Sequence, residues 1–88
     1  MKKVLIVGAG SAIAEHYARL EAAAGSSLVL VGRSAVRLQA ISDDVRVRGA
    51  GGVAMFTLDV NDIEHHEAVL DAAWAWLGDV DVVLLAHG

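Results

Sequence analysis

The stretch VLIVGAGSAIA at residues 4–14 decides the fold class of this 88-residue chain. A short apolar run typical of a buried strand leads into a turn of small residues, and a helical segment follows at once. Backbone N–H groups in such a turn can face a pyrophosphate, because no large side chain blocks its approach. We expect Gly8 to make the tight turn and Gly10 to admit the phosphate. An ordinary strand-to-helix turn is the alternative.

The small residues of this turn depart from the pattern GxGxxG, because Ile13 occupies the position of the last glycine. Ala14 is the best match to the third small residue, which lets the helix pack closely on the strand. The pattern is therefore GxGxxxA. In this segment, the residues expected to contact a dinucleotide are Gly8, Ala9, Gly10, Ser11, Ala12 and Ile13.

Three further apolar runs, at residues 28–31, 53–58 and 82–86, also have the composition of buried strands. The segments between successive runs carry apolar residues at helical spacing, and each is followed by a glycine. The predicted core stripes are Ile13, Tyr17, Leu20 and Ala24 in the first helix, Leu38, Ile41 and Val45 in the second, and Ile63, Leu70, Trp74 and Leu77 in the third. Trp76 is then left partly exposed, as a candidate self-association patch.

Strands alternating with helices predict a parallel sheet with right-handed crossovers. We expect an α/β fold of the Rossmann type, with three αβα layers and a partial doubly wound parallel sheet of strand order 3-2-1-4, in one domain over residues 1–88. The first two helices then cover one face and the third covers the other, so one side of the fourth strand is bare. A bare apolar edge calls for a missing C-terminal half or a second copy, and we favour truncation.

The end of the second predicted strand selects the cofactor. NAD-binding folds usually have Asp or Glu there, which accepts hydrogen bonds from the ribose 2′-hydroxyl. Here Arg33 and Ser34 follow the strand, and the Arg33 guanidinium can bind a 2′-phosphate. We therefore expect NADP(H) in preference to NAD(H). Ser34 can add a hydroxyl and a helix N-terminal amide, and Arg37 can close over the adenine or the phosphate. Both arginines also fit an alternative in which they are solvated residues that start an exposed helix.

These residues together resemble the short-chain dehydrogenase/reductase family, and the resemblance covers the whole chain. In that family a TGxxxGxG loop follows the first strand, and a basic residue after the second strand marks NADP preference. Gly8 fits the first family glycine, while Ala12 and Ala14 stand where the other two glycines would be. The resemblance also implies that Asp59 and Val60, which follow the third strand, contact the adenine ring.

The fourth strand of the family ends in NNAG, a motif that stabilises the central sheet and lines the cofactor cleft. Gly88 keeps the glycine of that motif, whereas both asparagines and the alanine are replaced. The position of this motif thus adds Ala86, His87 and Gly88 to the expected cofactor-binding residues. A role of His87 near the nicotinamide ribose is a hypothesis from its place at the strand end and is not carried over from the family motif. The catalytic Ser, Tyr and Lys of the family lie well beyond this strand. We therefore predict no catalytic residue within the chain.

Composition and charge exclude several other classes of protein. The formal net charge is −4 and no run of Lys or Arg is present, so neither a nucleic acid nor an anionic membrane is an expected partner. The chain has no cysteine, and His65 and His66 point about 100° apart on a helix, so no metal site is predicted. The apolar run at residues 4–7 is too short for a signal peptide. We expect a soluble, cytoplasmic protein.

The resemblance implies an NADP(H)-dependent oxidoreductase in which this chain is the cofactor-binding half. A missing half would bind a small-molecule substrate and promote hydride transfer, so the chain alone would be catalytically silent. The alternative from another class is a non-enzymatic dinucleotide-sensing or regulatory module, although such modules more often keep an acidic residue where Arg33 stands. A domain that has lost ligand binding is the third interpretation.

Overall fold

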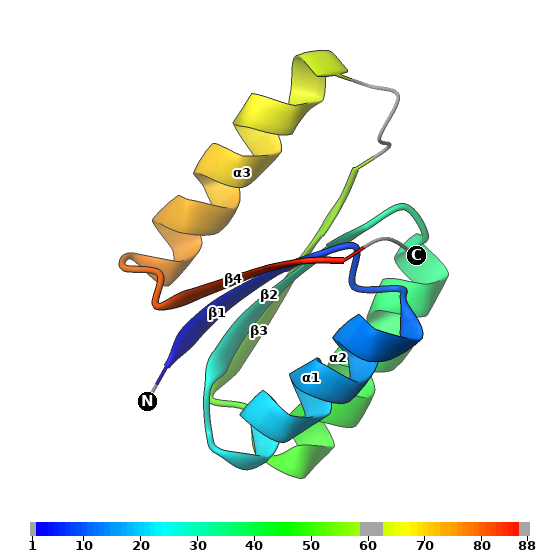
Figure 1. The fold of residues 1–88 in the computed structure, drawn as a ribbon, viewed down its shortest axis with the longest axis vertical. Helices are drawn as coiled ribbons and strands as arrows, with labels where there is room; N and C mark the ends of the chain where they lie inside the picture. Colours follow the sequence, from blue (N-terminus) through cyan, green and yellow to red (C-terminus); the bar gives the residue numbers. More distant parts are fainter. Residues whose placement is uncertain (1, 59–62, 87–88) are drawn as a thin grey trace.

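The computed structural model describes residues 2–58 and 63–86, in which strands and helices alternate strictly (Figure 1). The elements are β1 (Lys3–Val7), α1 (Ala12–Ala23), β2 (Ser27–Gly32), α2 (Ala35–Arg48), β3 (Gly52–Thr57), α3 (Ile63–Leu77) and β4 (Val82–Leu85). Each predicted strand is present, with ends that differ by one residue at most. Since a crossover helix lies between each two successive strands, the strands can pair in parallel.

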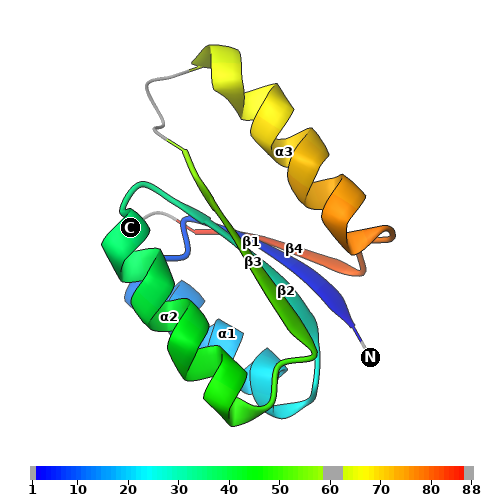
Figure 2. The same cartoon turned by 180° about the vertical axis from the view of Figure 1, so that it is seen from behind.

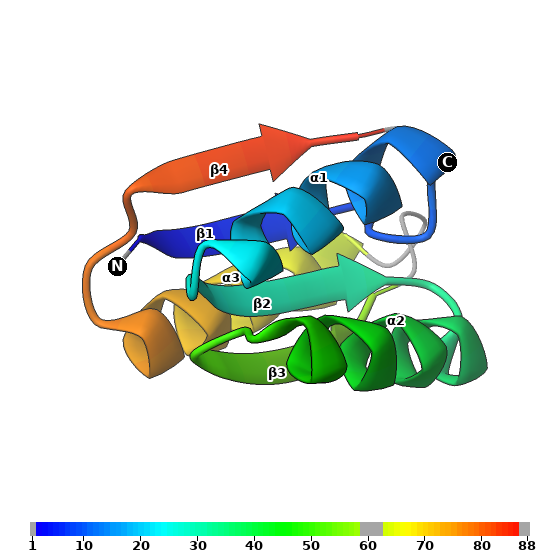
Figure 3. The ribbon, with the colours of Figure 1, turned by 90° about the horizontal axis from the view of Figure 1, so that it is seen from below.

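All strand pairs are parallel, and the sheet has the order β3-β2-β1-β4 (Figure 3). The predicted fold class and strand order are therefore confirmed. Helices α1 and α2 lie together on one face of the sheet, and α3 lies alone on the other (Figures 1 and 2). None of the helices in the described part of the chain is long and apolar enough to cross a membrane.

The pairing of β1 with β4 joins the two ends of the chain. Val4 lies opposite Val82, and the backbone N–H of Lys3 donates to a carboxylate oxygen of Asp81 at 2.8 Å. The N–H of Asp81 donates in return to the Lys3 carbonyl at 2.8 Å. β1 is consequently an inner strand whose two neighbours are β2 and β4.

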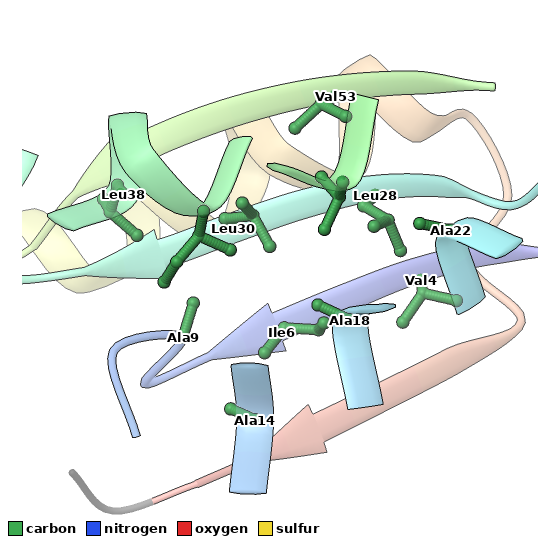
Figure 4. Packing of buried hydrophobic residues seen from close by; sticks show 12 residues of the cluster. Val4, Ile6, Ala9, Ala14, Ala18, Ala22, Leu28, Leu30, Leu38 and Val53 are labelled. Carbon is green, nitrogen blue, oxygen red and sulfur yellow. The ribbon is translucent and has the colours of Figure 1, made fainter. Parts of the chain in front are cut away.

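The buried face of α1 is a row of alanines, not the stripe predicted from the sequence. Ala14, Ala18 and Ala22 are fully buried and pack in the cluster that Figure 4 shows. Side chains this small allow the helix to lie close to the sheet, as we expected for Ala14 alone. The core of this face therefore consists of large side chains from the strands and from α2, and of small ones from α1.

The predicted stripe of α1 was largely wrong. Ile13 and Leu20 are 78% and 58% exposed, and Ala24 is an exposed residue that caps the helix. Tyr17 is half-buried at the border of the core. In α2, by contrast, the predicted residues Leu38, Ile41 and Val45 are all buried.

The buried face of α3 contains Ala73 and Leu77, of which only Leu77 was predicted. Leu70 and Trp74 are 38% and 48% exposed, which corrects the prediction for both, and the Ile63 side chain lies outside the described part. Trp76 is half-exposed, as expected. Its ring lies beside β3, since a Cβ on Gly52 would be 3.2 Å from Trp76 Cη2.

β4 has one covered side and one bare side, as the sequence predicted. Val82 and Leu84 are half-buried against the α1 and α2 cluster. Val83 and Leu85 point to the face of α3, because Val83 pairs with Leu5, which packs on that side. Both are exposed, since α3 packs over β1, β2 and β3.

Candidate functional site

A cavity of about 530 Å³ lies at the carboxyl ends of the strands. It is lined by residues at the ends of β1, β2 and β4, by the start of α2 and by Leu58, which follows β3. Crevices outside the carboxyl ends of parallel strands are where open α/β sheets bind ligands. The predicted site residues that line it are Gly8, Gly10, Arg33, Ser34, Arg37 and Ala86.

The other predicted site residues fall into two groups. Ala9 is buried beneath the cavity, and Ser11, Ala12 and Ile13 form the start of α1 beside it. The remaining ones lie outside the described residues: Asp59, Val60, His87 and Gly88. The structure therefore brings the glycine-rich turn, Arg33 after β2 and Arg37 of α2 to one cavity.

Residues 8–11, which we call the glycine loop, are tied to both neighbouring strands. The N–H groups of Gly8 and Ala9 donate to the Val31 carbonyl of β2 at 2.8 and 3.0 Å. Gly8 has a φ of +83°, and a Cβ at this position would lie 1.9 Å from the Ala86 carbonyl oxygen. Only glycine meets both requirements, because it tolerates positive φ and has no side chain.

The start of α1 offers unused backbone donors. The Ser11 hydroxyl caps the helix by accepting from the Ala14 N–H at 3.1 Å, and the Ser11 N–H donates to the Gly8 carbonyl. The N–H groups of Gly10, Ala12 and Ile13 reach no acceptor among the residues that the structure describes. Donors of this kind at a helix N-terminus favour an anion, because the helix dipole adds partial positive charge.

The two arginines of the cavity differ in their contacts. Arg33 is exposed and makes no hydrogen bond or ion pair within the described ranges. Arg37 donates through Nε to the Gly10 carbonyl at 2.8 Å, and its Nη2 lies 3.3 Å from a carboxylate oxygen of Glu15. Ser34 caps α2, since its hydroxyl accepts from the Arg37 N–H at 3.2 Å.

The contact between Arg37 and the glycine loop was missed by the sequence analysis. The sequence predicts that Gly10 admits a phosphate, and the structure adds that a Cβ there would lie 3.3 Å from both Cδ and Nε of Arg37. Glu15, which completes the contact, was not singled out at all. No local pattern signals this contact, because the residues are far apart in the sequence.

A polar cluster lies at the amino ends of β1 and β2, at the opposite end of the strands from the cavity. The Tyr17 hydroxyl donates to buried Glu21 at 2.5 Å, and the Ser26 hydroxyl donates to the same carboxylate at 3.0 Å. The hydrogen bond to Glu21, together with burial, raises the pKa of Tyr17 to about 12. The hydrogen bonds from Tyr17 and Ser26 and the nearby Lys2 ammonium lower the pKa of Glu21 against the opposing effect of burial.

Parallel strands of order 3-2-1-4, a glycine loop after the first strand and a cavity at its carboxyl end define an α/β protein of the dinucleotide-binding type of fold. The family model for short chain dehydrogenases matches residues 2–88. The chain therefore belongs to the short-chain dehydrogenase family.

Individual relatives agree with this assignment. The chain is 35% identical over 85 residues to an uncharacterized oxidoreductase of Mycobacterium tuberculosis, covering 94% of this chain and 25% of the relative. An alcohol dehydrogenase from the archaeon Thermococcus sibiricus, solved with 5-hydroxy-NADP, is 37% identical with a TM-score of 0.84, over 94% of this chain and 35% of that one. An NAD⁺-bound xylitol dehydrogenase, 24% identical, shares the fold with a TM-score of 0.84 over 93% and 31% of the two chains. The chain thus spans about a quarter to a third of these relatives.

Proposed function

We propose that this chain binds a dinucleotide, NADP(H) in preference to NAD(H), as the cofactor-binding half of an oxidoreductase. The observation that carries the proposal is Arg33, an exposed guanidinium without a partner among the described residues, on the wall of the cavity beside the glycine loop. A cation that no carboxylate of the described residues holds is available to an anion. When bound, the nicotinamide cofactor supplies the hydride chemistry.

The pyrophosphate would lie at the glycine loop. The unused N–H groups of Gly10, Ala12 and Ile13 supply neutral donors, and the dipole of α1 adds partial positive charge. Gly8 and Gly10 let the loop pack closely, because a Cβ at Gly8 would meet the Ala86 carbonyl oxygen and a Cβ at Gly10 would meet Arg37. These features fit a dinucleotide on observations of this chain itself, apart from its family membership.

The adenosine end would lie between β2 and α2. Arg33 would bind the 2′-phosphate, and Ser34, whose oxygen caps α2, still has a hydroxyl proton to donate. The family resemblance adds Asp59 and Val60 at the adenine, and Ala86, His87 and Gly88 along the rest of the cofactor, as further proposed contacts. No carboxylate lines the described cavity, which favours a cofactor with an additional phosphate.

The parent protein, on this proposal, is an NADP(H)-dependent oxidoreductase whose remaining part binds a small-molecule substrate. Relatives that carry oxidoreductase and dehydrogenase names favour this function over a non-enzymatic sensing module. Solved relatives hold cofactors of both the NADP and the NAD type. The preference for NADP(H) therefore rests on Arg33 rather than on the relatives.

The test is a calorimetric titration of the purified chain with NADP⁺ and NAD⁺. We expect tighter binding of NADP⁺, and we expect Arg33→Ala to weaken NADP⁺ binding by about tenfold or more while NAD⁺ binding stays the same. Arg48→Ala is the matched control, because Arg48 is an exposed arginine at the far end of α2, the helix that follows Arg33. Equal affinity for the two nucleotides, or an unchanged preference in Arg33→Ala, would contradict the proposal.

A further inference from the structure

Arg37 links the first turn of α2 to the glycine loop. Its Nε donates to the Gly10 carbonyl at 2.8 Å across 27 residues of sequence, and its Nη2 lies 3.3 Å from a Glu15 carboxylate oxygen. Both partners lie on the β1–α1 side of the cavity, whereas Arg37 itself belongs to α2. The side chain therefore spans the space between the two helix N-termini.

The carbonyl that Arg37 holds controls the orientation of the loop. The Gly10 carbonyl and the Ser11 N–H belong to one planar peptide unit, so they point in opposite directions. The Ser11 N–H donates to the Gly8 carbonyl at 3.1 Å, and Arg37 fixes the other side of the same peptide. A carbonyl oxygen turned towards a bound phosphate would repel it. Holding this carbonyl leaves for the anion the N–H groups of Gly10, Ala12 and Ile13, which reach no acceptor among the described residues.

The charge of Arg37 already has a partner. Glu15 lies beside both Arg37 and Arg19, and Arg19 in turn pairs with Asp44 of α2 at 2.8 Å. The Nε–H and one Nη2–H of Arg37 are thus engaged, and the adjacent Glu15 carboxylate would repel a 2′-phosphate that approached this guanidinium. Arg33 has neither of these contacts.

The absence of a side chain at Gly10 allows the close approach of Arg37. A Cβ at Gly10 would lie 3.3 Å from Cδ and Nε of Arg37, which is tighter than ordinary van der Waals contact. Glycine at this position thus lets the guanidinium approach the carbonyl. The hydrogen bond and the missing side chain are two separate observations of the same close approach.

We infer that Arg37 is a positioning residue, which holds the glycine loop in its anion-binding conformation and does not itself bind the dinucleotide. Arg33 and Arg37 then have separate roles, one in choosing between the two dinucleotides and the other in binding either of them. The inference rests on the proposed function for its effect on binding. Its effect on the loop itself needs no nucleotide.

The first experiment measures hydrogen exchange of the Ser11 amide by NMR in the nucleotide-free chain. We expect Arg37→Ala to speed this exchange by about five- to tenfold, because the peptide loses a charge-assisted hydrogen bond on its other side. Arg37→Lys should restore part of the protection, and Glu15→Gln should have a smaller effect in the same direction as Arg37→Ala. Arg48→Ala, which removes an arginine contact at the other end of α2, should leave Ser11 unchanged.

Unchanged Ser11 exchange in a folded Arg37→Ala protein would overturn the inference. Far-ultraviolet circular dichroism checks the fold of each variant. If Arg37→Ala does not fold, the Ser11 exchange of Glu15→Gln and Arg37→Lys is compared with that of wild type instead. Both variants keep a polar side chain at the substituted position. Exchange that rises equally throughout the chain would also count against the inference, because a positioning role predicts a local change.

The second experiment titrates each variant with NADP⁺ and NAD⁺. Arg37→Ala should weaken the binding of both nucleotides by the same factor of about five to ten, whereas Arg33→Ala should change the ratio between them. A loss confined to NADP⁺ in Arg37→Ala would make Arg37 a phosphate ligand and overturn the inference. If the wild-type chain binds neither nucleotide, the proposed function fails, and the exchange experiment still decides whether Arg37 holds the loop.

Discussion

The two faces of the sheet bury the same kinds of residue to different extents. On the face of α1 and α2, the half-buried Val82 and Leu84 of β4 complete a core that extends across the whole sheet. On the face of α3, their neighbours Val83 and Leu85 are exposed, although they are just as apolar. The difference shows that coverage by a helix, and not apolar character alone, decides what is buried.

The largest expected effect contrasts one leucine on each face. Leu30→Ala removes a fully buried side chain from the α1 and α2 core, and we expect it to lower the free energy of unfolding by about 3–5 kcal/mol. Leu5→Ala, on the α3 face, should cost about 2–3 kcal/mol, because water can enter from the bare side of β4. Urea unfolding followed by circular dichroism measures both. A larger loss for Leu5→Ala would break the comparison.

The polar cluster of Tyr17, Glu21 and Ser26 makes the stability of the α1 and α2 face depend on pH. We expect Glu21→Gln to cost about 1–2 kcal/mol at neutral pH, because the buried carboxylate accepts two hydrogen bonds. The pKa of Glu21 is lowered in the folded state, so its contribution is complete above the unfolded pKa and is lost as the pH falls through the folded pKa.

At alkaline pH, Tyr17 gives the dependence of stability on pH the opposite sign. The pKa of Tyr17 is raised from 10.0 to about 12, so its contribution is complete below pH 10.0 and is lost as the pH rises through about 12. Thermal melts over a pH series should show that the melting temperature of wild type exceeds that of Glu21→Gln. The difference should be constant at pH values between the unfolded pKa of Glu21 and that of Tyr17. Tyr17→Phe serves as the control, since it should remove the alkaline decline. A margin that is constant from acid to alkali would contradict the assignment.

A smaller effect of opposite direction is expected at Ser42. Its hydroxyl is fully buried in α2 and has no hydrogen-bond partner among the described residues. Ser42→Ala should therefore raise the free energy of unfolding by about 0.5–1 kcal/mol, through lower desolvation cost and better helix propensity. Ser26→Ala is the matched substitution on the same face, and it should destabilise, because the Ser26 hydroxyl donates to Glu21. The same urea experiment compares them, and destabilisation by Ser42→Ala would show that its hydroxyl has a partner.

The smallest effect is expected on the bare side of β4. Leu85 is 72% exposed, so Leu85→Ser should change the free energy of unfolding by less than about 0.5 kcal/mol. Leu84→Ser, one residue away on the covered face, should cost about 1–2 kcal/mol. Thermal melts of the two variants provide the measurement. Equal losses would mean that the two sides of β4 are covered alike.

The sequence was sufficient for the topology because apolar runs and helical segments alternate, and the handedness of crossovers then leaves few arrangements. It was not sufficient for the inner face of α1. Hydrophobicity ranks Ile13 and Leu20 above alanine, whereas close packing of a helix on a sheet selects small side chains such as Ala18. The predictions for Leu70 and Trp74 were wrong for another reason. Ala73 and Leu77 are the residues of α3 that pack on the sheet, so Leu70 and Trp74 remain half-exposed.

The candidate site was predictable where its signals are local. The glycine loop follows β1 directly, and Arg33 follows β2, so parallel pairing alone brings both to one cavity. The partner of Arg37 was not predictable, because Gly10 and Glu15 lie more than twenty residues away and belong to another helix–strand unit. A rotamer choice between a loop carbonyl and a ligand phosphate leaves no trace in residue type or spacing.

The pairing of β1 with β4 also sets an order of folding. β2 can pair with β1 and β3 through short crossovers, whereas the contact between Lys3 and Asp81 closes a loop of nearly the whole chain. Contacts of such long sequence separation form slowly, because the closure entropy is lost before they are gained. The Ala86 carbonyl that packs against Gly8 arrives with β4. Within residues 1–88, the ligand cavity is therefore expected to acquire its native shape after the pairing of β1, β2 and β3.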